Sequence, residues 1–177
     1  MSDTCPPPSA PQSAPPSAPP PPDRIALVPV RADSPEARYA LQCYYDELSA
    51  RFGQTFAPPA ADPDETWPPR GVFLVARGGD RVLGCGALRT DAPGVGEIKR
   101  VWIAPAARGM GLARRIMAAL EDHARAMGLA TLRLDTAAPL TEAITLYRRS
   151  GWTEIARYND NPHASHWFEK AVARDTP

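Results

Sequence analysis

Residues 97–128 read EIKRVWIAPAARGMGLARRIMAALEDHARAMG, and this stretch decides the fold. β-Branched and aromatic residues alternate in its first part, which predicts a strand over about residues 96–103. Pro105 follows, and proline cannot donate a ladder hydrogen bond, so the strand ends before it. Apolar residues then recur at helical spacing from Leu112, and Gly128 favours a left-handed stop. The stretch therefore predicts a strand, a short turn and an amphipathic helix.

The start of this predicted helix lacks a capping side chain. The segment from Arg108 to Arg115 contains two glycines and three arginines, but no Ser, Thr, Asp or Asn. The first turn of a helix leaves about four N–H groups without partners, and the helix dipole already disfavours cations there. Bare amides beside arginines therefore indicate a site for an external anion. The alternative is an uncapped helix end with its arginines in water.

At this turn the residues resemble the GNAT superfamily, the acyl-CoA-dependent N-acetyltransferases. Arg108-x-x-Gly111-x-Ala113 matches the Arg/Gln-x-x-Gly-x-Gly/Ala motif of that family. The preceding segment 101–105 (VWIAP) and the later segment 143–152 (AITLYRRSGW) are similar to the segments that flank the motif in the family. The resemblance covers about residues 25–172, and the three segments in this order are together a strong signature.

The resemblance implies a binding site for acetyl-CoA. No metal is expected, because His163 and His166 have no supporting cysteine and His123 lies far away on a helix. Backbone N–H groups of the turn would hold the pyrophosphate, and the strand before it would splay from its neighbour to pair with pantetheine. One N–H near Val101 or Trp102 would stabilise the thioester oxygen. The asparagine that many relatives carry after the next strand is absent, so its hydrogen bond is either missing or supplied by Thr136. The implied cofactor-binding residues are Val101, Trp102, Ile103, Arg108, Gly109, Met110, Gly111, Leu112, Ala113, Arg114, Thr136 and Tyr147.

Tyr147 is the candidate general acid. The thiolate that leaves during acetylation benefits from a proton donor. Tyr147 matches the tyrosine that the family places near the CoA sulfur. The alternative is a half-buried tyrosine that packs beside Leu146.

Glu97 is the candidate general base, because several relatives carry a glutamate there that deprotonates the amine, often through water. Strand alternation predicts that Glu97 shares a face with Lys99, Val101 and Ile103. The alternative is a surface carboxylate paired with Lys99 or Arg100.

The acceptor site is harder to predict. In the family it is built by the first helices and the loop between the last two strands. Aromatic and polar residues in these segments suit a small ligand, although packing and turn chemistry explain most of them as well. The candidates are Tyr44, Tyr45, Glu47, Phe56, Trp67, Tyr158, Asn159, Asn161, His163, His166 and Trp167.

The rest of the chain predicts an α+β domain with a mixed, mostly antiparallel sheet. The resemblance adds splayed central strands and helices on both faces. We expect about seven strands, over residues 25–30, 72–76, 81–90, 96–103, 131–135, 152–158 and 166–172, and helices over 35–52, 112–127 and 140–150.

The chain has 177 residues and a formal net charge of zero, and its length favours a single domain. Bulk attraction to nucleic acid or an anionic membrane is therefore not expected, and no apolar run is long enough to span a bilayer. Residues 1–22 hold ten prolines and predict a disordered tail, followed by the domain over 23–173 and a short tail over 174–177. The three cysteines show no framework spacing, which suits a cytoplasmic protein. Family members often pair, so a homodimer is compatible with the resemblance.

The sequence thus predicts an acetyl-CoA-dependent N-acetyltransferase that acts on a small primary amine, without a covalent enzyme form. One alternative is a non-catalytic acyl-CoA-binding module. The other is a Rossmann-like nucleotide-binding domain, suggested by Gly109-x-Gly111 after a strand. Arg114 occupies the third glycine position of that motif, and residues 104–107 separate strand from motif, so this alternative is disfavoured.

Overall fold

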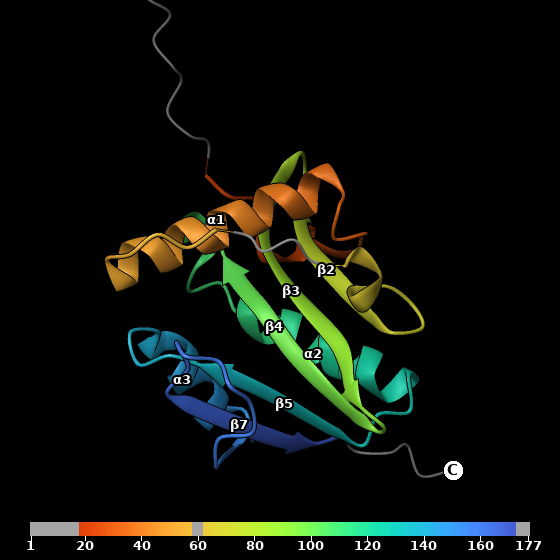
Figure 1. Ribbon diagram of the computed structural model, residues 1–177. Helices are drawn as coiled ribbons and strands as arrows, with labels where there is room; N and C mark the ends of the chain where they lie inside the picture. The colour runs from red at the N-terminus through yellow and green to blue at the C-terminus, as the bar shows by residue number, and fades with distance from the viewer. Residues whose placement is uncertain (1–17, 58–61, 173–177) are drawn as a thin grey trace, which may run out of the picture.

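The computed structural model describes residues 18–57 and 62–172. The predicted tails over 1–22 and 174–177 therefore fall mostly outside the described residues. A seven-stranded sheet carries helix α1 on one face and helices α2 and α3 on the other (Figure 1). The strands are β1 (Ala26–Pro29), β2 (Gly71–Gly78), β3 (Arg81–Ala92), β4 (Val95–Ile103), β5 (Thr131–Thr136), β6 (Thr153–Ile155) and β7 (His166–Ala171), and the helices are α1 (Pro35–Phe52), α2 (Leu112–Ala126) and α3 (Thr141–Arg149). Short 3-10 turns lie at Pro22–Arg24, Pro63–Thr66 and Pro105–Ala107.

The strands lie in the order β1-β2-β3-β4-β5-β7-β6. Every neighbouring pair is antiparallel except β4 and β5, which are parallel. The predicted mixed, mostly antiparallel sheet is therefore confirmed. Each predicted element is present, although β6 is shorter than the predicted strand over 152–158.

The two central strands separate along their length. β4 and β5 pair only where residues 95–97 lie beside residues 131–133. Beyond Glu97, β4 continues to Ile103 while β5 diverges from it (Figure 1). The expected splay is confirmed, and it opens the sheet near the start of α2.

A β-bulge interrupts β4 at Arg100, which has a φ of 57°. A bulge inserts one residue, so the side-chain alternation reverses across it. Ile98, Val101 and Ile103 consequently all face α2, while Trp102 packs in the cluster beneath α1. The expectation that Glu97 and Lys99 share a face with Val101 and Ile103 is therefore wrong.

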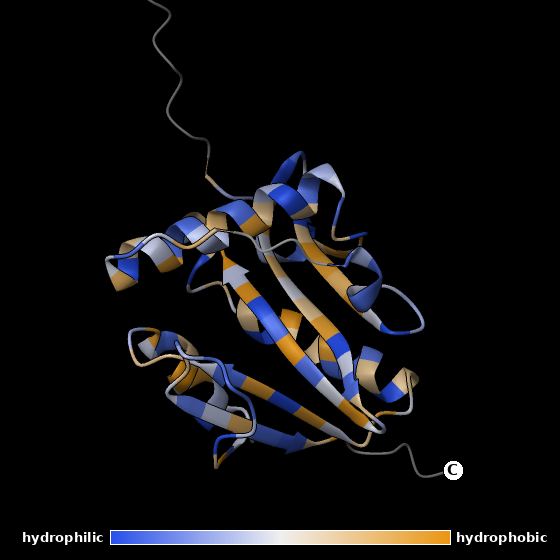
Figure 2. Ribbon diagram, in the orientation of Figure 1, coloured by the Kyte–Doolittle hydropathy of each residue, from blue (hydrophilic) through white to orange (hydrophobic). Residues whose placement is uncertain are grey.

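Two apolar clusters fill the space on either side of the sheet. Hydrophobic and hydrophilic residues alternate along β5 (Figure 2), and the inward-facing Leu132 and Leu134 are buried. Helix α2 approaches β3 closely because Gly86 has no side chain; a Cβ there would lie 2.7 Å from Ile116 Cγ2. Within residues 18–57 and 62–172, every helix is too short or too polar to cross a membrane.

Candidate functional site

Two cavities meet where β4 and β5 separate. Cavity A, of about 540 Å³, lies beside the start of α2. Cavity B, of about 420 Å³, extends along the α1 side of β4 and β5. The residues that border both cavities are Tyr44, Leu48, Val101, Leu140, Ala143 and Tyr147.

The start of α2 opens into cavity A. Gly111 is the N-cap residue, and no side chain caps the helix, as the sequence predicted. Gly109 and Gly111 have φ values of 77° and 75°, a conformation that glycine adopts at little cost. The turn residues that line the cavity are Arg108, Gly109, Gly111, Leu112, Ala113 and Arg114. The cavity therefore offers backbone amides and two arginines to an anion.

Two expected cofactor residues lie elsewhere. Met110 packs against the apolar cluster around α2 and does not line cavity A. Thr136 is buried and borders cavity B. Val101, Trp102 and Ile103 do line cavity A.

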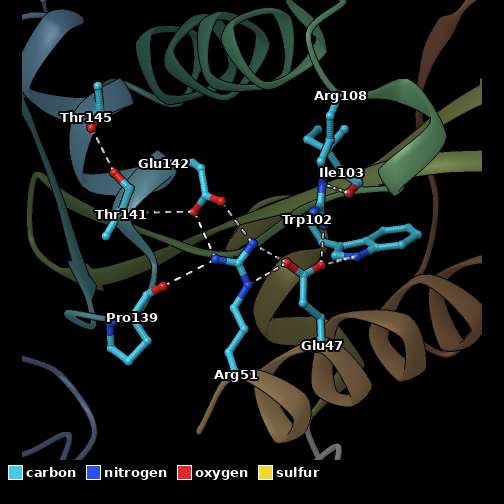
Figure 3. A network of polar contacts seen from close by, with 9 residues as sticks. All are labelled: Glu47, Arg51, Trp102, Ile103, Arg108, Pro139, Thr141, Glu142 and Thr145. Atoms are coloured by element: carbon cyan, nitrogen blue, oxygen red, sulfur yellow. Dashed lines mark hydrogen bonds and ion pairs between the residues drawn. The ribbon is translucent and has the colours of Figure 1, made fainter.

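A network of charged side chains crosses cavity A (Figure 3). Glu47 on α1 accepts hydrogen bonds from Arg108 at 2.6 Å and from Trp102 Nε1 at 3.2 Å. Arg51, one turn further along α1, pairs with Glu47 and with Glu142 of α3, each at 2.8 Å. The network therefore joins α1 to the turn before α2 and to the start of α3.

Tyr147 lies where the two cavities meet. Its ring packs against Trp152 and Phe168, with centroids 6.0 and 5.6 Å apart, and the residue is only 5% exposed. It packs in the apolar cluster, as the alternative predicted, and is more deeply buried than that alternative supposed. Burial raises the pKa of its phenol, and the charge of Asp135 adds to that rise. The phenol is therefore protonated at neutral pH, and its raised pKa makes it a weaker acid than a free tyrosine.

Glu97 is buried, with 2% of its side chain exposed, so it is not a surface carboxylate. It pairs with Arg89 at 2.8 Å and with Lys99 at 3.2 Å. Tyr158 and Asn159 donate further hydrogen bonds to it. Burial alone would raise the pKa of Glu97, but Lys99 and Arg89 outweigh burial and hold that pKa below its ordinary value.

Asp135 is a polar residue of cavity B that the sequence did not single out for the acetyltransferase site. Asn159 Nδ2 donates to one of its oxygens at 2.6 Å, and Asn161 Nδ2 donates to the other at 2.9 Å. These partners come from the connection between β6 and β7. A lone aspartate at the end of a strand gives no sequence signal of this environment.

The predicted acceptor residues divide into two groups. Tyr44, Tyr45, Phe56, Asn161 and His163 line cavity B, together with Phe52, which the sequence did not indicate. The others have different surroundings. Glu47 lines cavity A, and Trp67 stacks beneath Arg31. His166 pairs with Glu154, and Trp167 donates a hydrogen bond to Asn159. Tyr158 and Asn159 donate hydrogen bonds to Glu97.

Comparison with known proteins points to one family. The acetyltransferase (GNAT) family model matches residues 41–152. An IAA acetyltransferase of Azospirillum brasilense is 45% identical over 83 residues, which are 46% of this chain and 54% of that protein. The chain thus spans about half the length of this curated relative.

Solved structures share the fold. An acetyltransferase of Streptococcus agalactiae superposes with a TM-score of 0.71 at 19% identity, covering 84% of this chain and 99% of the other. The N-acetylglutamate synthase of Neisseria gonorrhoeae, solved with coenzyme A and N-acetylglutamate, gives a TM-score of 0.66 at 18% identity, covering 85% of this chain and 35% of the other.

Proposed function

This chain belongs to the GNAT family of acetyltransferases, and from that membership we propose that it transfers an acetyl group from acetyl-CoA directly to the primary amine of a small acceptor. One observation carries the proposal: the uncapped start of α2 faces a cavity that continues, past Tyr147, into a second cavity. A volume of about 420 Å³ for the second cavity suits a small acceptor.

The residues of cavity A fit acetyl-CoA. The amides of Gly109, Gly111 and the first turn of α2 would hold the pyrophosphate, with Arg108 and Arg114 as cationic partners. Beyond Glu97, one edge of β4 faces β5, but the two strands form no ladder there within the described residues. That edge can therefore pair with the amide groups of pantetheine.

When bound, acetyl-CoA would supply an activated acetyl group as a thioester. An N–H of the bulged segment at Val101 or Trp102 would donate to the thioester oxygen as negative charge develops. An amine that binds as ammonium would first release one proton to solvent. Tyr147, whose phenol remains neutral, would then give its proton to the departing sulfur, and the proton that the nitrogen loses as the amide forms would restore the phenol. The arrangement requires no nucleophilic side chain, and Cys85 is buried with a pKa raised to about 12 by that burial.

Glu97 is the candidate base from the sequence, and its surroundings favour a different role. A carboxylate with a lowered pKa and two cationic partners is a weak proton acceptor. We propose that Glu97 mainly organises cavity B, because it fixes Arg89, Lys99 and Tyr158 around it.

Ligand-induced stabilisation tests the proposal. A ligand at about 100 times its dissociation constant adds roughly 2.7 kcal/mol to the free energy of unfolding. We expect acetyl-CoA and CoA to raise the melting temperature, and NAD and ATP to leave it unchanged. The double variant Arg108→Ala, Gly111→Asp should lose the response, while Arg157→Ala, which removes an exposed arginine that lines neither cavity, should keep it.

Acetyl transfer is then measured as CoA release with a panel of primary amines. Turnover that requires an amine supports the proposal. Stabilisation by NAD or ATP without CoA, or binding of acetyl-CoA without transfer to any amine, would overturn it.

A further inference from the structure

Three carboxylates line cavity B, and they differ in their partners. Glu97 lies within 3.2 Å of two cations, and Glu65 pairs with Arg89 at 3.6 Å. Asp135 forms no ion pair within the described part of the chain; its partners are the neutral amides of Asn159 and Asn161. Asp135 is therefore the carboxylate of this cavity that has no cationic nitrogen within 4.0 Å among the described residues, although Arg89, Lys99 and Arg100 also line the cavity.

The splay of the sheet explains why Lys99 does not pair with Asp135. Glu97 lies opposite Arg133 in the last registered pair of β4 and β5. Two residues further along, Lys99 and Asp135 would face each other if the ladder continued. The strands have separated by then, and no nitrogen of Lys99 lies within 4.0 Å of Asp135. Cavity B occupies the space between them.

The two asparagines orient Asp135 without neutralising it. Each carboxylate oxygen accepts one N–H hydrogen bond, and each has a further lone pair for another donor. Asp135 also lies close enough to Tyr147 for its charge to act on that phenol. A cation bound at Asp135 would therefore lie near the junction with cavity A.

The wall of cavity B also carries aromatic side chains. Phe52, Phe56 and His163 pack edge to face, with Phe56 centred 5.2 Å from Phe52 and 4.8 Å from His163. Tyr44 and Tyr45 form a further edge-to-face pair that lines the same cavity. Such a wall suits the apolar or aromatic body of a ligand.

We propose that Asp135 binds the protonated amine of the acceptor, and that the acceptor is a cationic primary amine attached to an apolar or aromatic body. This inference rests on the proposed function and names the substrate class for the same site. A charge-assisted hydrogen bond from ammonium to a partly buried carboxylate gives the interaction its strength. Acceptors that are neutral at the same position lack that bond.

Calorimetry on the full chain with saturating CoA tests the proposal without turnover. The probes are matched pairs that differ in charge: phenethylamine with phenethyl alcohol, and tryptamine with tryptophol. We expect the wild-type protein to bind at least one amine more tightly than its alcohol. Asp135→Asn should weaken amine binding by about tenfold to a hundredfold and alcohol binding by less than about twofold.

Asp160→Asn is the matched control, because Asp160 lies between Asn159 and Asn161 but its side chain is fully exposed. It should leave both affinities unchanged. Asp135→Ser provides a second neutral variant if the new amide disturbs Asn159 or the fold, which circular dichroism would reveal. Asp135→Glu keeps the charge and should retain part of the preference for amines.

Several results would overturn the inference. One is a wild-type protein that binds no amine more tightly than its alcohol; another is a folded neutral variant that keeps the wild-type preference. If the wild-type protein binds CoA and acetylates an amine in either case, the proposed function stands and only the role of Asp135 falls. If CoA itself does not bind, the proposed function falls with it.

Discussion

Replacing Glu47 with glutamine should tighten CoA binding while it lowers the stability of the fold. Glu47 accepts a hydrogen bond from Arg108, at 2.6 Å, and pairs with Arg51. A pyrophosphate at the start of α2 must compete with this carboxylate for Arg108. Glutamine has the same shape and can still accept from Trp102, but it removes the competing charge. Binding and stability should therefore change in opposite directions.

The structure sets the size of the effect. The side chain of Arg108 is 42% exposed and that of Glu47 is 24% exposed, so solvent screens the pair. Partly exposed ion pairs contribute about 0.2–1 kcal/mol. Because Glu47→Gln removes this ion pair, Arg108 would be free to contact the pyrophosphate, and the dissociation constant of CoA should fall by about 1.4- to 5-fold. A loss of about 1 kcal/mol in unfolding free energy corresponds to roughly 2–4 °C in melting temperature for a domain of this size.

Calorimetric titration with CoA and urea denaturation measure the two effects. Glu36→Gln is the control, because Glu36 lies on the same helix, pairs with Arg77 at 2.7 Å and lines neither cavity. It should cost similar stability and leave CoA affinity unchanged. Weaker CoA binding in Glu47→Gln would refute the reasoning, since Glu47 would then hold Arg108 in its binding position. Unchanged affinity would mean that Arg108 does not contact the ligand.

Three further predictions concern the same site. Tyr147→Phe should reduce turnover far more than it weakens acetyl-CoA binding, and unchanged turnover would exclude the acid role. Gly111→Ala should destabilise the fold by about 1–2 kcal/mol in urea denaturation, because alanine is strained at a φ of 75°, and it should also weaken CoA binding. The control is Gly53→Ala, at a φ of 65° outside the site, which should lower stability without changing CoA binding. Burial raises the pKa of Glu97, but Lys99 and Arg89 lower it by more, so the folded-state pKa lies below its ordinary value. The ionised carboxylate therefore stabilises the fold near neutral pH, and this contribution is lost as the pH falls through the folded-state pKa. Glu97→Gln should therefore be less stable than wild type near neutral pH, and urea denaturation should show the gap close in acid; a gap that does not depend on pH would contradict this.

The sequence predicted those parts of the fold that local patterns determine. Apolar spacing fixed α2, and its missing cap was visible because capping depends on residues within one turn. The bulge at Arg100 was invisible, since neither glycine nor proline marks it. A missed bulge moves every later side chain of the strand to the other face, which is why the predicted face for Val101 and Ile103 was wrong.

Long-range partners were also beyond prediction from the sequence. The carboxylate that holds Arg108 is 61 residues away in the sequence, so no local pattern indicates the pair. The environment of Asp135 depends on two asparagines from the connection between β6 and β7 and on the absence of a cation across the splay. Such properties arise only when tertiary packing fixes which charges are balanced.

The bulge in β4 also links the two cavities. In a regular strand Trp102 would face α2, as Ile98 does. The inserted residue instead turns Trp102 toward α1, where its Nε1 donates to Glu47, the same carboxylate that holds Arg108. It also turns Val101 toward α2 and leaves it bordering both cavities, beside Tyr147. One irregular residue therefore positions the charged network of cavity A and the strand edge at which the two cavities meet.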